Sequence, residues 1–164
     1  MSNLNWRYLS GYPEPLLAKV SGLIESRQLG DYLSRKYPER HTVQSDKALH
    51  AYVTELKQTH LRNAPVIDRT CYDSKLDVIQ NALGLHTRQS RNHGGRLRSS
   101  REIRIASLFK AMPPEFLKMI VVHELAHLKE LDHNKAFYQL CEHMAPGYAQ
   151  LEFALRLHLT WQAL

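Results

Sequence analysis

A long apolar segment in the C-terminal half of the chain constrains the fold most strongly. Residues 116–128 contain no helix breaker, and Pro113-Pro114 precedes them, where proline suits a first helical turn. Their apolar side chains occupy almost every face of a helix, which predicts a helix buried in the core. Besides Lys118 near its start, this run contains three polar side chains, those of His123, Glu124 and His127. Burying them is costly unless a partner compensates them.

The spacing of these three residues matches the pattern H-E-x-x-H. Residues four apart lie one above the other on a helix, so the imidazoles of His123 and His127 can converge on one ion. Glu124 then lies beside the ion, where it can take a proton from a metal-bound water with a pKa lowered to about 7. We therefore expect two histidine ligands, Glu124 as the catalytic base, and Zn²⁺ or another divalent transition metal as cofactor.

We expect His133 to be the third metal ligand. An unbroken helix would turn this side chain away from the ion, so the helix must end before it. Asp132 is then expected to cap the helix that follows. The spacing matches that of metzincins, although Glu130 stands where their pattern has glycine. His133 as a solvated loop residue, and Glu142 or His143 as the ligand, are the alternatives.

The remaining sequence predicts one α+β domain spanning residues 1–164. Residues 1–64 read as helical, residues 65–110 as a short antiparallel or mixed sheet, and residues 113–164 as the metal-site and C-terminal helices. Ser45 is a good N-cap for a helix that runs to about Leu61, and Gly30 is expected to end an earlier helix. Residues 65–72, 76–79, 85–91 and 101–106 are the candidate strands.

Arginine side chains are concentrated before the long apolar helix. Six of them fall within seventeen residues, with a turn at residues 92–95: Arg88, Arg91, Arg96, Arg98, Arg101 and Arg104. A guanidinium group suits phosphate or carboxylate, so this hairpin would attract an anionic substrate if it rims the metal site. A solvated strand face is the alternative. The candidate substrate-binding residues are His86, Arg88, Arg91 and Tyr138, and Tyr148 is a further candidate for stabilising an oxyanion.

The overall composition favours an anionic partner, because the formal net charge is +6. We expect no membrane partner, since no apolar run is long enough to span a bilayer. The N-terminal residues do not resemble a secretory signal, and Cys71 and Cys141 are too far apart for a disulfide framework or C-x-x-C site. A cytoplasmic location is therefore expected.

Two segments of the chain, 121–130 and 133–137, closely resemble the YgjP-like metallopeptidase domain family, to which SprT-like and WLM domains are related. The similarity extends upstream through residues 83–87 and covers most of the chain. It implies a small zincin-like α+β fold, with His123, His127 and His133 as zinc ligands and Glu124 as general base. Many relatives carry Trp-Gly-Ser in the hairpin, where this chain has residues 88–95 of different sequence.

The resemblance leaves the substrate open, because part of the family is known as metal-dependent UTP pyrophosphatases. In one interpretation, a peptide pairs with the strand that ends near Ala106. In another, a nucleoside triphosphate is cleaved to monophosphate and pyrophosphate with the arginines on its phosphates. A third interpretation is a nucleic-acid-binding module with a structural metal. It is not favoured, because structural zinc sites usually have four protein ligands, often cysteine.

Overall fold

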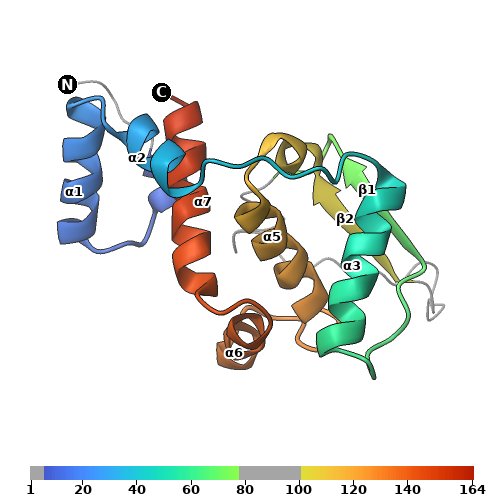
Figure 1. Cartoon of the computed structure of the whole chain (residues 1–164). Helices are drawn as coiled ribbons and strands as arrows, with labels where there is room; N and C mark the ends of the chain where they lie inside the picture. The colour runs from blue at the N-terminus through green and yellow to red at the C-terminus, as the bar shows by residue number, and fades with distance from the viewer. Residues whose placement is uncertain (1–5, 78–100) are drawn as a thin grey trace. The chain divides into compact units, whose positions relative to one another are not determined.

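The computed structural model describes residues 6–77 and 101–164, which form helices and a small sheet (Figure 1). In chain order the elements are η1 (Trp6–Leu9), α1 (Glu14–Glu25), α2 (Leu29–Lys36), α3 (Asp46–His60), β1 (Arg69–Asp73), β2 (Glu102–Ala106), η2 (Ser107–Ala111), α5 (Pro114–Ala126), α6 (Lys135–Met144) and α7 (Tyr148–Gln162). This arrangement confirms the expected α+β class, with helices on both sides of the strands in sequence.

The chain divides into two compact units. One comprises Met1–Glu39 together with Ala149–Leu164, and the other comprises Arg40–Tyr148. The second unit therefore contains α3, both strands, α5 and α6. All three histidines expected to bind metal lie within it.

The two strands pair in parallel, with Arg69 opposite Glu102 and Asp73 opposite Ala106. The pair is thus parallel rather than antiparallel, although a mixed sheet, the other expectation, also contains parallel pairs. The connection permits this direction, because residues 74–101 lie between the strands and a parallel crossover needs roughly a dozen residues or more. Residues 76 and 77 are in no strand, and the candidate strand at 85–91 and the expected turn at 92–95 lie outside the described residues.

Alternation along β2 sets which side chains enter the core. Ile103 and Ile105 are buried, whereas Arg104 between them is exposed. α3 packs against β1, and α5 packs against β2, so the buried face of the sheet lies under these helices. The α5 helix is itself buried over most of its length, which confirms the expected core helix.

The two residues expected to mark helix ends, Ser45 and Gly30, have different roles in the structure. The Ser45 hydroxyl accepts a hydrogen bond from the Ala48 amide at 3.1 Å, which confirms Ser45 as the N-cap of α3. Gly30 does not end a helix, because α1 ends at Glu25 and Gly30 lies inside α2. A Cβ atom at Gly30 would lie 2.8 Å from Nε1 of Trp161, so close packing explains this glycine.

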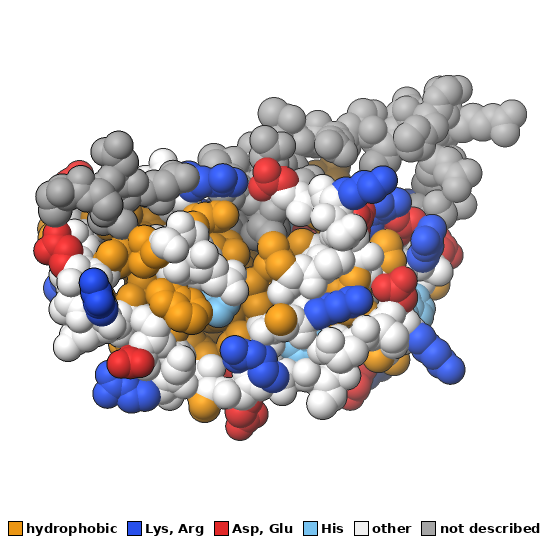
Figure 2. Space-filling model, turned by 90° about the horizontal axis from the view of Figure 1, so that it is seen from above, with side chains coloured by type: hydrophobic (Ala, Val, Ile, Leu, Met, Phe, Trp, Pro, Cys, Tyr) orange, Lys and Arg blue, Asp and Glu red, His pale blue; other side chains and the backbone are white. Residues whose placement is uncertain are grey.

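The surface seen in Figure 2 carries interspersed charges. Lys and Arg side chains lie there among Asp and Glu side chains. None of the described helices combines the length and the apolar character that crossing a membrane requires.

Candidate metal centre

Three imidazole nitrogens converge at the C-terminal end of α5. The Nε2 atom of His127 lies 3.3 Å from that of His123 and 3.1 Å from that of His133, and the remaining pair is 3.1 Å apart. Tetrahedral zinc with bonds of about 2.0–2.1 Å to nitrogen places two ligand nitrogens about 3.3–3.4 Å apart. The donor atoms and their spacing therefore fit one divalent transition metal ion. Within residues 6–77 and 101–164 this is the one group of three or more potential ligands.

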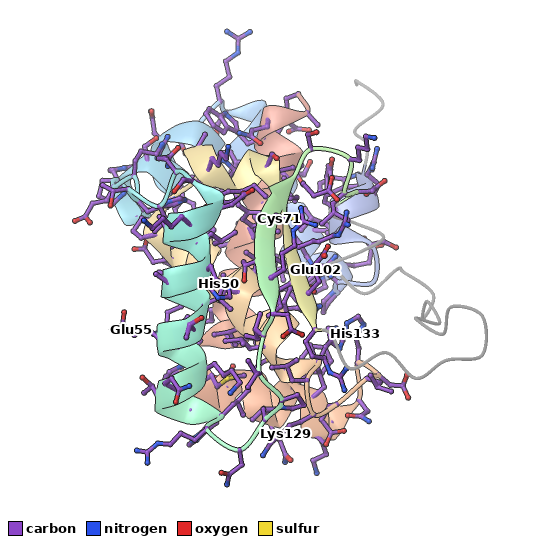
Figure 3. The ribbon with its side chains drawn as sticks, turned by 90° about the vertical axis from the view of Figure 1, so that its right-hand side faces the viewer. His50, Glu55, Cys71, Glu102, Lys129 and His133 are labelled. Carbon is purple, nitrogen blue, oxygen red and sulfur yellow. The ribbon has the colours of Figure 1, made fainter. Side chains whose placement is uncertain are left out.

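The end of α5 brings His133 to the other two histidines. The helix ends at Ala126, and His127 is its C-cap with φ −67° and ψ −11°. The Glu130 amide still donates to the Ala126 carbonyl at 2.9 Å, which tightens the turn. This confirms that the helix ends before His133, which lies on the far side of the two strands from α3 in Figure 3.

The turn after α5 lacks the glycine of the metzincin pattern. Glu130 occupies that position, yet among the described residues Arg27 is the only non-glycine residue with positive φ. The backbone at Glu130 is therefore in a conformation open to any residue. The Glu130 carbonyl oxygen lies 2.9 Å from Nδ1 of His127, within hydrogen-bond distance.

The cap of α6 differs from the prediction. The Asn134 side chain, not that of Asp132, accepts the hydrogen bond from the Phe137 amide, at 2.9 Å. The helix begins at Lys135, so its N-cap position falls on Asn134. The Asp132 carbonyl accepts from the Asn134 amide at 2.8 Å and closes the turn before the helix. This cap fixes the backbone one residue after His133.

The outer nitrogens of the two helical histidines also have partners. A carbonyl only accepts, so the proton of His127 lies on Nδ1 and is donated to Glu130. Neutral His127 then has a lone pair on Nε2, facing the cluster. Nδ1 of His123 lies 2.8 Å from the Tyr148 hydroxyl. Tyr148 therefore contacts a proposed ligand directly, a position that sequence reasoning did not give it.

Phe137 forms an apolar wall against all three imidazoles. Its ring is fully buried and stacks on His127 with centroids 4.6 Å apart. The centroid separations from His123 and His133 are 4.9 and 4.8 Å. Sequence analysis did not single out Phe137 as a site residue, because its place in the apolar pattern of α6 looks like that of any core residue.

The other candidate site residues differ in burial and in distance from the three histidines, and some lie outside the described residues. Glu124 follows His123 on α5 and is half-buried. Tyr138 is 37% exposed, and its ring centroid lies 6.4 Å from that of His133. The predicted substrate contacts His86, Arg88 and Arg91 lie outside the described residues.

The alternative ligands Glu142 and His143 are not in the three-histidine group. The Glu142 carboxylate accepts a hydrogen bond from the Gly147 amide at 3.0 Å. The ring of His143 meets that of His60 edge-on, with centroids 5.9 Å apart. Both side chains therefore take part in local packing of the α6 region.

One arginine of the basic cluster is held by carboxylates. Arg104 bonds to Asp73 at 2.7 Å and also to Glu102, and these hydrogen bonds raise its pKa above the ordinary value. The hydrogen bond from the Lys75 amide and then that from Arg104 lower the pKa of Asp73. Arg104 therefore belongs to an ionic network on the exposed face of the sheet.

Comparison with known proteins gives the family. The sequence profile described as "YgjP-like, metallopeptidase domain" matches residues 24–158. The chain belongs to the YgjP-like metallopeptidase domain family. A UTP pyrophosphatase from Escherichia coli (strain K12) is 58% identical over 160 residues, which cover 98% of this chain and 95% of that protein. No solved structure matches significantly. The family and the relative both identify a hydrolytic enzyme.

Proposed function

We propose that this YgjP-like protein is a divalent-metal hydrolase in which His123, His127 and His133 hold the ion and Glu124 acts as the general base. The observation that carries this proposal is the convergence of three Nε2 atoms, 3.1–3.3 Å apart, at the end of a buried helix. Three protein nitrogens with a further position left for water are typical of catalytic zinc. Zn²⁺ is therefore the ion that we propose.

The proposed chemistry is attack of water on the substrate. A bound divalent cation would supply Lewis acidity, lowering the pKa of the attacking water and polarising the oxygen of the attacked group. Glu124 accepts a proton from this water and delivers it to the leaving group. The Glu130 carbonyl keeps the His127 proton on Nδ1, and the Phe137 ring excludes solvent from one side of the cluster.

We propose a nucleoside triphosphate, specifically UTP, as the substrate. The relative that is 58% identical along nearly the whole chain is named for this activity. Water would attack the α-phosphorus, and the products would be UMP and pyrophosphate. Arg88 and Arg91 would bind the phosphates, and Tyr138, exposed beside His133, would contact the substrate.

A peptide is the second candidate substrate, and the family description favours it. β2 leads through the short η2 helix into α5, so this strand lies close in sequence to the proposed ligands. An extended peptide would pair with β2 through its backbone. The two candidates share His123, His127, His133 and Glu124, so only the substrate assay separates them.

Pyrophosphate release from UTP by zinc-loaded protein, beside cleavage of an unstructured polypeptide, tests this proposal. We expect Glu124→Gln to lower pyrophosphate release about 10²–10⁴-fold while bound zinc is unchanged, because a positioned base contributes a factor of that size. Glu130→Gln is the matched control, since it retains the backbone carbonyl on His127. Full activity of Glu124→Gln would refute the proposed role of Glu124.

Arg88→Ala and Arg91→Ala test the choice of substrate. We expect each variant to lose pyrophosphate release but to retain zinc, because the arginines would contact phosphate and not the metal. Arg104→Ala is the control, since Asp73 and Glu102 already bind that side chain. Unchanged release in both variants, or polypeptide cleavage without UTP hydrolysis, would favour the peptide candidate.

A further inference from the structure

We propose that Tyr148 is a positioning residue for the metal centre: its hydroxyl accepts the Nδ1 proton of His123 and so keeps Nε2 of that histidine available as a ligand. This inference rests on the proposed function. It goes beyond it by giving a role to a residue 25 positions away in sequence, at the start of another helix.

The geometry holds Tyr148 in place from several sides. It is the first residue of α7 and is 1% exposed. Gly147 before it has φ +84°, a left-handed conformation that glycine adopts without strain. The Glu142 carboxylate accepts a hydrogen bond from the Gly147 amide at 3.0 Å. The turn between α6 and α7 therefore delivers the hydroxyl to within 2.8 Å of Nδ1 of His123.

The direction of this hydrogen bond follows from the chemistry of a ligand histidine. A neutral imidazole that binds through Nε2 carries its proton on Nδ1, so Nδ1 must donate. The phenol oxygen of Tyr148 can accept that proton. His123 is 1% exposed, so solvent cannot easily replace this acceptor. Removing this hydroxyl would take a hydrogen-bond acceptor away from the buried N–H group of His123 in its ligand form.

The two helical ligands thus depend on different kinds of partner. His127 donates to a main-chain carbonyl, which no side-chain substitution removes. His123 depends on a side-chain hydroxyl, so a single substitution can delete the contact while the aromatic ring stays in place. Outer partners of this kind typically change metal affinity about 10–100-fold.

Zinc affinity of Tyr148→Phe, measured by competition with a chromophoric chelator, tests the inference. We expect a dissociation constant about 10–100-fold higher than that of the wild type. Tyr72→Phe is the matched control, because the Tyr72 hydroxyl donates to the Val43 carbonyl at 2.7 Å, a hydrogen bond that involves none of the three proposed ligands. The control removes a comparable hydrogen bond and should leave zinc affinity unchanged.

A second measurement does not depend on how the variant folds. In zinc-loaded wild-type protein, long-range ¹H–¹⁵N NMR spectra should show the His123 proton on Nδ1 and the metal on Nε2. Equal zinc affinity for Tyr148→Phe and wild type, or an unprotonated Nδ1 in the loaded protein, would overturn the role of Tyr148 alone. Wild-type protein that binds no zinc would instead overturn the proposed function, and this inference with it.

Discussion

The imidazole of His133 reaches the two helical histidines from outside their helix. His123 and His127 alone would supply two ligands to the proposed ion, whereas catalytic zinc sites have three protein ligands. The third nitrogen lies 3.1 Å from each of the others, close enough to complete a three-coordinate protein set. The position of His133 therefore supports the proposed metal centre over a chance H-E-x-x-H match.

Substitution of His133 should remove metal binding without removing the fold. We expect His133→Ala to raise the zinc dissociation constant more than about 100-fold, since losing only an outer partner costs about 10–100-fold. His143→Ala, on the same stretch of chain but packed against His60, should bind zinc like the wild type. Isothermal titration with zinc measures both. Equal affinity of the two variants would exclude His133 as a ligand.

Local spacing in the sequence predicts which of these side chains come together. Four-residue spacing on a helix placed His123 and His127 together, and the need to break the helix placed His133 beside them. It does not find contacts between distant residues. The Tyr148 hydroxyl meets His123 across 25 positions, and no periodicity of either helix encodes that contact. The Asn134 cap was missed because Asp132 two positions earlier is an equally good capping residue.

At the scale of elements, the start of α6 holds the third histidine. The Asn134 cap orders the backbone next to His133, and Phe137 three residues later packs against its ring. The capping side chain of Asn134 and the ring of Phe137 both belong to the start of α6. Order in this turn should therefore be coupled to metal binding.

Removing the Asn134 cap tests this coupling. Asn134→Ala should lower the free energy of unfolding by about 0.5–2 kcal/mol and also weaken zinc binding. Ser45→Ala removes the corresponding cap of α3, where the hydroxyl accepts from the Ala48 amide, so it should cost similar stability. It should leave zinc affinity unchanged. Urea unfolding and zinc titration of both variants make the comparison, and equal zinc affinities would show that the cap is only structural.

The pH dependence of stability provides a test in α7. Burial raises the pKa of Glu152, and Arg156, with Nε 4.0 Å from the carboxylate, lowers it in part. A carboxyl with a higher pKa in the folded than in the unfolded protein stabilises the fold fully at pH values below its ordinary pKa. This contribution is lost as pH rises through the raised value. Glu152→Gln should therefore gain stability relative to wild type between about pH 4 and about pH 7. Urea unfolding at both pH values measures it, and a constant difference would contradict the assignment.

The predicted elements illustrate what periodicity can supply. It predicts the α3 helix, the buried α5 helix and a strand at the position of β2. It could not give the parallel pairing of β1 and β2, because pairing direction depends on the path between strands. Gly30 was misread because a glycine required by the approach of Trp161 looks the same in sequence as one that ends a helix.

At the scale of the whole molecule, the proposed ligands all belong to one compact unit. Arg40–Tyr148 contains the three histidines, Phe137 and Tyr148, whereas Met1–Glu39 and Ala149–Leu164 form the other unit. The chain passes between units directly after Tyr148. Metal binding should therefore stabilise the histidine-containing unit first.

Hydrogen exchange with and without a chelator tests this expectation. Removing zinc should increase exchange in α5 and α6, because binding at 100 times the dissociation constant stabilises a fold by about 2.7 kcal/mol. Exchange in α1, which lies in the other unit, should change much less. An equal loss of protection in all helices would show that the two units unfold together.

Diffraction from zinc-loaded crystals at the zinc absorption edge tests the central claim most directly. We expect one anomalous peak, about 2.0–2.1 Å from Nε2 of His123, His127 and His133, with no fourth protein ligand. Such a centre leaves the remaining position for water beside Glu124. A zinc ion bound elsewhere, or one closed by four protein ligands, would contradict the proposal of a catalytic three-histidine centre.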